Sequence, residues 1–170
     1  MARSRANLPF KVVNHRGRPG FDPGLQRHHL LPRQALRHAG LAAMLQALGR
    51  ERIGFDDFRR NGLLLPARDE AAIRLRLPLH CGPHRAYNEL VIERVGQIEA
   101  TWASLRLSSA STAGIVALQR LALLQNALRR RLLDPGTGAF RLHRRDPSGR
   151  PQDFSELDAM AATMWPDTDV

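Results

Sequence analysis

The stretch LQRHHLLP at residues 25–32 carries two adjacent histidines, His28 and His29. We expect it to be a short extended segment that ends at Pro32, because proline lacks the backbone N–H that a strand interior needs. Neighbouring side chains of an extended segment point to opposite faces. The two histidines therefore cannot hold one ion side by side, and we expect one to bind a metal while the other faces a substrate.

A second histidine pair has the spacing His80-x-x-x-His84. Two histidines four positions apart can point the same way from one helical face, or from its lip and first turn, and so reach one ion. Neutral imidazole is a common ligand of transition metals. With a third nitrogen from the first pair, such a set leaves positions open for water and a phosphate oxygen, which is typical of a catalytic site. The remaining histidine suits a general base, since free imidazole has a pKa of about 6.5.

Apolar residues recur at helical spacing over much of the chain and indicate an α-rich α+β fold. An Asn61-Gly62 turn followed by Leu63-Leu64-Leu65 and Pro66 indicates a short strand. The leucines of the last long helix should form a packing face: Leu118, Leu121, Leu124 and Leu128. The helices are expected over residues 33–48, 83–102, 113–133 and 155–164.

The formal net charge is +10, and Lys11 is the only lysine among 26 basic residues. Arginine's planar guanidinium suits bidentate phosphate contacts and stacking on bases, so this composition favours a nucleic-acid partner. Composition alone leaves open a coding bias toward arginine, with the charge serving only solubility. Before Gly54 the only acidic residues are Asp22 and Glu51, so the positive field is expected on the N-terminal part.

Cys81 is the only cysteine, which excludes a disulfide within the chain and a four-thiolate zinc site. It stands between the candidate ligands His80 and His84, but the following Gly82 indicates a turn that directs the thiol elsewhere. No apolar run approaches the ~20 residues of a membrane span. Residues 1–20 lack the apolar core of a signal peptide. We therefore expect neither a membrane segment nor a cleaved signal.

Three segments together resemble the AHH nuclease family of the HNH/endonuclease VII superfamily. They are RHHLLP at residues 27–32, NGLLLP at residues 61–66 and LHCGPHRAYN at residues 79–88, and the resemblance covers roughly residues 26–95. It implies a small ββα-metal, treble-clef-like active-site motif, here with an inserted helix and additional C-terminal helices. The family's name residue, an alanine before the double histidine, is Arg27 in this chain.

The resemblance also implies roles for individual residues. His28 is expected to bind the metal and His29 to act as the general base, with His80 and His84 as the remaining ligands. Asn61 matches the middle Asn of an HNH motif, whose side chain ties the loop together and helps to orient the base. Arginines in or near these segments are expected to contact the phosphate backbone: Arg27, Arg33 and Arg85.

We expect residues 1–24 to form a basic N-terminal arm or linker, residues 25–104 the HNH-like nuclease core, and residues 105–170 a helical extension packed on the core. The expected activity is phosphodiester hydrolysis by a metal-dependent endonuclease with one divalent cation. Imidazole ligands do not distinguish among Mg, Mn, Zn and Ni as that cation. DNA is favoured over RNA as the substrate.

The resemblance further implies an antibacterial toxin module of a bacterial polymorphic toxin system, with a cognate immunity protein as its partner. Such a protein is cytoplasmic in the producing cell and is secreted or delivered into a target-cell cytoplasm without a cleaved signal peptide. Three alternatives remain open: an RNA-cleaving toxin, a non-catalytic nucleic-acid-binding module with a structural histidine-metal site, and an adaptor whose leucine-rich helix binds a partner.

Overall fold

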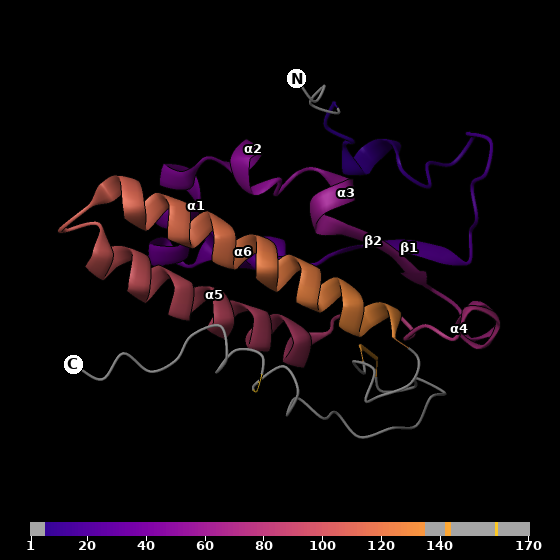
Figure 1. Ribbon diagram of the computed structural model, residues 1–170. Helices are drawn as coiled ribbons and strands as arrows, with labels where there is room; N and C mark the ends of the chain where they lie inside the picture. Colours follow the sequence, from indigo (N-terminus) through magenta and orange to yellow (C-terminus); the bar gives the residue numbers. More distant parts are fainter. Residues whose placement is uncertain (1–5, 135–141, 144–158, 160–170) are drawn as a thin grey trace.

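The computed structural model describes residues 6–134, 142–143 and 159 (Figure 1). Its strands and long helices are β1 (Leu25–His29), β2 (Gly62–Pro66), α5 (Arg85–Leu105) and α6 (Ala110–Leu133). The shorter elements are the 3-10 helices η1 (Phe10–Val12) and η2 (Arg33–Arg37) and the α-helices α1 (Ala39–Leu48), α2 (Arg50–Ile53), α3 (Phe58–Asn61) and α4 (Asp69–Leu75). Within the described residues, helices thus dominate and one small sheet accompanies them.

The two strands pair in antiparallel register, with His28 opposite Leu63 and His29 opposite Gly62. The chain between them forms η2 and the helices α1 to α3, so the sheet joins segments that are distant in the sequence. The strand expected after Asn61 is confirmed. Helix-rich structure with a two-stranded antiparallel sheet also confirms the α-rich α+β class.

The expected Asn61-Gly62 turn is wrong. Asn61 is the last residue of α3, and Gly62 begins β2 with an extended backbone at φ −116° and ψ 153°. Glycine is needed here for space rather than for conformation, because a Cβ atom on Gly62 would overlap the ring of Phe58. The pair that reads as a turn in the sequence is therefore a helix-to-strand junction under an aromatic ring.

The long helices α5 and α6 lie side by side and run in opposite directions (Figure 1). Their shared face is apolar and supplies much of the core, which includes Val91, Val95 and Ile98 from α5 and Leu121, Leu124 and Leu128 from α6. The predicted leucine packing face of the last helix is confirmed at these three positions, and Leu118 is partly buried beside them. α6 begins at Ala110, three residues earlier than predicted, because the Ser109 hydroxyl accepts a hydrogen bond from Thr112 N and caps the helix.

Two other helix predictions need correction. The helix expected over residues 33–48 is divided at His38, whose extended backbone separates η2 from α1; one 3-10 turn has nearly the apolar spacing of an α-helix. α5 begins at Arg85 rather than at Pro83 and continues to Leu105. α4 was not predicted, since this short charged helix buries only two alanines. The helix expected over residues 155–164 lies outside the described residues, apart from the single position 159.

The N-terminal segment lies against α3. Leu8 donates its backbone N–H to Oδ1 of Asp57 at 3.1 Å and accepts from Phe58 N at 2.8 Å. Pro9 and Asp57 also form an isolated antiparallel bridge. Residues 6–24 are therefore in contact with the fold, although the predicted division into arm, core and extension stays a prediction. No helix in the described part of the chain is long and apolar enough to cross a membrane.

Candidate metal centre and catalytic site

Three of the predicted residues, His28, His80 and His84, form a tight cluster. His28 comes from β1, His80 from the loop before α5, and His84 is the N-cap residue of α5. Their ring centroids are 4.7–4.9 Å apart. One ring nitrogen from each lies within 4.8 Å of the others, so the three side chains can hold one metal ion.

Backbone and side-chain contacts place His80 in this cluster. Its backbone N–H donates to Pro66 O at 2.7 Å, which joins the loop to the end of β2. Its ring Nδ1 lies 3.1 Å from Oε1 of Gln26 on β1. Gln26 was not predicted as a site residue, but it stands two positions before His28, the spacing that puts side chains on one face of a strand. That hydrogen bond fixes the His80 ring and leaves Nε2 for a ligand.

The environment of His28 is the strongest indication that this cluster suits a metal ion. Its side chain is 1 % exposed, and among the residues that the structure describes neither ring nitrogen has a hydrogen-bond partner. A buried imidazole loses its hydration and gains nothing in return unless its N–H and lone pair find partners. A metal ion bound to one nitrogen supplies such a partner. Nδ1 of His84 is also buried without a partner, so the residues present fit a bound metal.

Burial lowers the pKa of all three clustered imidazoles. The pKa of His28 is well below its usual value, first because of burial and then because His80 and His84 face it. Burial and then His84 lower the pKa of His80 to about 4, and burial lowers the pKa of His84. The three rings are therefore neutral at pH 7, which is the form that binds a metal.

His84 lies at the start of α5, and Cys81 lies in the loop before it. We expected His84 to sit firmly inside a helix, but it is the N-cap residue, with φ −109° and ψ 70°, because α5 begins one residue later. Cys81 is exposed and is not part of the histidine cluster. The following Gly82 has a left-handed backbone, with φ +81°, as the predicted turn requires.

His29 has surroundings unlike those of its neighbour. Its half-buried ring stacks on Phe10, with centroids 3.8 Å apart and planes 2° from parallel. It makes no hydrogen bond to any residue that the structure describes. Burial first, and then Arg33 and Arg27, lower the pKa of His29 to about 4 against the opposing effect of Asp56. The double histidine is thus split into one ring within the cluster and one ring outside it.

Asn61 is fully buried, so its amide cannot touch a substrate. Its Oδ1 accepts from Leu31 N at 2.8 Å and from Nε2 of Gln125 at 3.3 Å. Its Nδ2 donates to Leu31 O at 3.2 Å and to Phe55 O at 2.9 Å. This amide therefore ties the loop after His29 to α6, which makes Asn61 a positioning residue.

Tyr87 is a further residue of the site and was not among the predicted site residues. Its side chain is 1 % exposed, and Oη donates to Leu30 O at 2.8 Å. The ring contacts His28 edge-on at 4.8 Å and stacks against His84 at 5.7 Å. The signal was its position three residues after His84, since residues three apart lie on one helical face. Tyr87 thus belongs to the core and also supports two of the clustered histidines.

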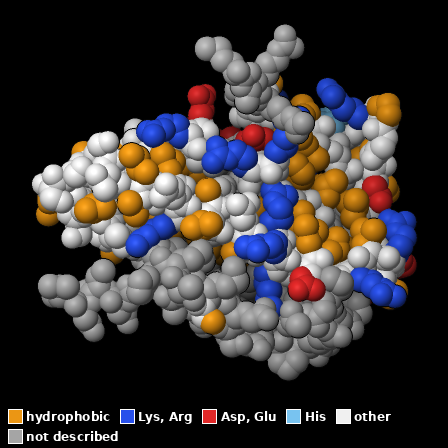
Figure 2. Space-filling view, in the orientation of Figure 1, with side chains coloured by type: hydrophobic (Ala, Val, Ile, Leu, Met, Phe, Trp, Pro, Cys, Tyr) orange, Lys and Arg blue, Asp and Glu red, His pale blue; other side chains and the backbone are white. Residues whose placement is uncertain are grey.

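The three predicted phosphate-binding arginines are exposed. Arg27 and Arg33 lie close enough to His29 to lower its pKa, and Arg85 is the first residue of α5, directly after His84. Basic side chains are spread over the face in Figure 2, with few acidic side chains among them. At His29 itself, Arg33 and Arg27 contribute a positive field, which favours an anionic substrate.

Other arginines donate hydrogen bonds to backbone carbonyl groups and so stabilise the fold. Arg59 donates to Ala6 O at 2.7 Å, Arg60 to Arg52 O at 2.7 Å, and Arg129 to Arg59 O at 2.8 Å. These bonds hold the N-terminal segment, α2, α3 and α6 together. Positive charge in this protein is therefore partly structural.

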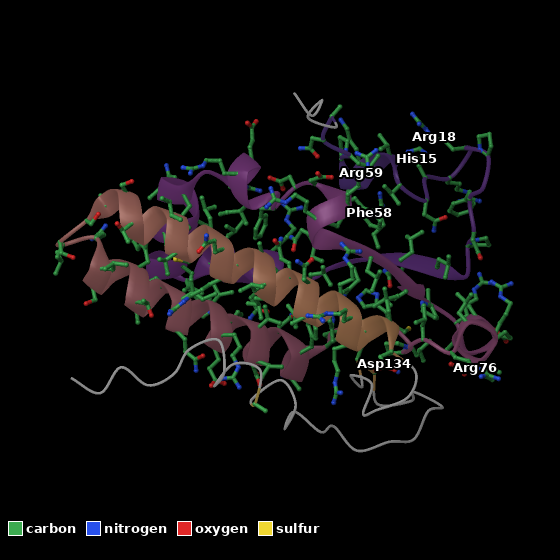
Figure 3. The ribbon with its side chains drawn as sticks, in the orientation of Figure 1. His15, Arg18, Phe58, Arg59, Arg76 and Asp134 are labelled. Carbon is green, nitrogen blue, oxygen red and sulfur yellow. The ribbon has the colours of Figure 1, made fainter. Side chains whose placement is uncertain are left out.

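The other histidines lie outside the cluster. His15 lies on the segment between η1 and β1, where Figure 3 labels it beside Arg18, and it is exposed. His38 is also exposed, and His143 is partly buried. None of the three belongs to the group that could hold an ion in the described residues.

Comparison with known proteins gives one match. A family model described as a nuclease family of the HNH/ENDO VII superfamily with conserved AHH matches residues 10–128. The match includes the N-terminal segment from Phe10 and most of α6, well beyond the residues 26–95 that carry the resemblance. Comparisons with curated proteins and with solved structures return no match. The chain belongs to the AHH family, and it is a nuclease of the HNH/ENDO VII superfamily.

Proposed function

We propose that this nuclease is a metal-dependent endonuclease that hydrolyses phosphodiester bonds, with DNA as the favoured substrate. The observation that carries the metal dependence is the buried ring of His28, whose nitrogens have no partner in the described residues and which lies beside His80 and His84. A divalent cation held by these three side chains supplies a Lewis acid that stabilises negative charge on the phosphate and on the leaving oxygen.

His29 is the proposed general base. Its neutral ring takes a proton from the water that attacks phosphorus, while the neighbouring His28 is committed to the cluster. Arg33 and Arg27 help to keep the pKa of His29 at about 4 in the substrate-free protein. A phosphodiester bound beside these arginines adds negative charge, which raises this pKa toward the range in which a base works best near neutral pH.

Arg27, Arg33 and Arg85 are the proposed phosphate contacts. All three are exposed and close to the histidines in space or in sequence. One guanidinium group can bind two oxygens of a phosphate at once, and each such contact releases counterions from the nucleic acid. Binding should therefore weaken as the salt concentration rises, and the dependence should become shallower when one of these arginines is replaced.

We further propose that the protein acts as an antibacterial toxin with a cognate immunity protein, delivered into the cytoplasm of a target cell. This role rests on the resemblance to toxin nucleases. A toxin nuclease made in the cytoplasm would also cleave the nucleic acid of its own cell, so this role calls for a specific inhibitor in the producer. Survival of an expressing cell only when a neighbouring gene product is co-expressed tests this role.

Digestion of plasmid DNA and of RNA with magnesium, manganese, zinc or nickel tests the enzymatic proposal. The proteins compared are the wild type, His29→Ala and, as a matched control, His38→Ala, since His38 is exposed and outside the cluster. We expect the wild type and His38→Ala to cleave equally, and His29→Ala to be slower by about 10²- to 10⁴-fold. Equal rates for His29→Ala and the wild type would contradict the mechanism.

The same experiment separates the alternatives. A wild type that cleaves neither nucleic acid with any of the four metals, yet still binds one ion, would favour a nucleic-acid-binding module with a structural site. Cleavage of RNA alone would favour the RNA-cleaving toxin.

A further inference from the structure

We propose that Phe10, in the N-terminal segment, is the residue that positions the ring of the general base His29. This inference rests on the proposed function, because it concerns the residue assigned there as the base. It makes the segment before β1 part of the catalytic site. Phe10 does not touch the substrate in this proposal and acts only through His29.

The geometry of the pair is that of a face-to-face stack. The ring centroids of Phe10 and His29 are 3.8 Å apart, and the ring planes differ by 2°. A histidine base is usually oriented by a hydrogen bond from its second nitrogen to a carboxylate or a carbonyl. His29 makes no such bond to the described residues, so the stack on Phe10 is the contact that fixes its ring plane.

Phe10 is itself held by a chain of aromatic contacts. The ring of Phe58 meets Phe10 edge-on, with centroids 5.1 Å apart and planes at 76°. Phe58 in turn needs Gly62 beneath it, because a Cβ atom there would overlap the Phe58 ring. Gly62 pairs with His29 across the sheet. The contacts therefore form a closed circle: His29 stacks on Phe10, Phe10 contacts Phe58, Phe58 packs over Gly62, and Gly62 pairs with His29.

Hydrogen bonds fix the backbone of the segment on either side of this contact. Arg27 donates from Nη1 to Phe10 O at 2.8 Å, which links Phe10 to β1 two residues before His29. Leu8 bonds to Asp57 and to Phe58, and Arg59 donates to Ala6 O. Figure 3 shows Phe58 and Arg59 on α3, which anchors the segment. These hydrogen bonds to β1 and to the α3 region hold the Phe10 backbone in place beside His29.

Steady-state kinetics and NMR of the Phe10→Leu and Phe10→Tyr variants of the 170-residue chain test the proposal. Leucine keeps an apolar side chain but removes the stack, and tyrosine restores the ring. The control is Phe21→Leu, since Phe21 is an exposed aromatic residue of the same segment that makes no ring contact with His29. We expect kcat of Phe10→Leu to fall about 10-fold with KM little changed, Phe10→Tyr to recover it, and Phe21→Leu to match the wild type.

Two readouts separate positioning from folding. In the wild type the ring protons of His29 should be shifted upfield by the stacked Phe10 ring, and Phe10→Leu should abolish this shift. In the His29→Ala background, Phe10→Leu should cause no further loss of the residual rate. Metal content and thermal unfolding of each variant show whether the fold and the cluster are intact.

Each contrary result has a definite meaning. If the wild type cleaves and Phe10→Leu cleaves as fast or faster, the positioning role is overturned while the proposed function stands. If the upfield shift is missing in the wild type, or if Phe10→Leu lowers the rate equally with and without His29, the positioning role is also overturned. If the wild type cleaves no nucleic acid, the proposed function fails and this role fails with it.

Discussion

Asn61 binds both backbone polar groups of Leu31: Oδ1 accepts from Leu31 N at 2.8 Å, and Nδ2 donates to Leu31 O at 3.2 Å. The two residues are 30 positions apart in the sequence, and the amide is fully buried. Leu31 stands two residues after His29, so this contact sets the path of the chain directly after the proposed base.

Replacing Asn61 with alanine should destabilise the protein by about 2–4 kcal/mol, because it leaves buried donors and acceptors of Leu31 and Phe55 without partners. Urea unfolding measures the change. The matched control is Asn126→Ala at an exposed position of α6, which should stay within about 0.5 kcal/mol of the wild type. Equal stability of the two variants would contradict the role of Asn61.

Gln125 couples α6 to the same amide, since its Nε2 donates to Oδ1 of Asn61 at 3.3 Å. Gln125→Leu should therefore lose about 1 kcal/mol of stability, and less when Asn61 is already alanine. A double-mutant cycle built on urea unfolding should give a coupling of about 0.5 kcal/mol or more. Strictly additive effects would mean that this bond does not connect α6 to the loop after His29.

Gly62→Ala and Gly96→Ala are expected to change stability in opposite directions. A Cβ atom at Gly62 would collide with Phe58 and displace the aromatic set beside His29, so we expect a loss of about 1–3 kcal/mol and slower cleavage. Gly96 lies in the interior of α5 with no atom near its missing Cβ, so alanine there should stabilise by about 0.5–1 kcal/mol. Thermal unfolding of both variants decides the matter, and a Gly62→Ala protein as stable as the wild type would contradict the packing described.

The metal-free protein should lose stability as the pH falls. The pKa values of His29 and His80 are about 4 in the folded protein, against 6.5 for the free side chain. Between these values the unfolded chain binds protons that the folded protein does not, so the free energy of unfolding is full above about pH 6.5 and declines toward about pH 4. Urea unfolding in the presence of a chelator, at steps from pH 7 to pH 4, measures this decline.

His80→Gln provides the matching control for that experiment. The variant carries one titrating group fewer, so its slope of unfolding free energy against pH should be smaller by up to about 1.4 kcal/mol per pH unit. An unchanged slope would mean that His80 is protonated equally well in the folded and unfolded states.

Part of the histidine cluster could be predicted from the sequence. Alternation along a strand separates His28 from His29. The pairing of His80 with His84 was also predicted, but His80 lies in the loop before α5 and His84 is the N-cap residue, so tertiary contacts rather than one helical face bring them together. The structure does bring His28, His80 and His84 together. The short strand after Asn61 could also be predicted, because a run of apolar residues follows this polar residue.

The remaining parts of the site depend on contacts that no local pattern reveals. Phe10 lies in a stretch without periodicity, and its partner His29 is on a different element. Gln125 is 64 positions from Asn61 on a helix whose leucines attract more notice. Gly62 was predicted to lie in a turn because Asn-Gly is common in turns. In the structure glycine is needed there because any Cβ atom would overlap the Phe58 ring. Tertiary packing, rather than local preference, decided each of these.

The central claim is that His28 binds the metal while the adjacent His29 acts as the general base. The metal content of purified His28→Ala and His29→Ala tests it most directly. Each variant is dialysed against the metal that supports cleavage, and bound ions per protein are counted by mass spectrometry. The account predicts about one ion in the wild type and in His29→Ala, and almost none in His28→Ala, with cleavage lost in both variants. An ion retained by His28→Ala, or lost from His29→Ala while the protein stays folded, would contradict it.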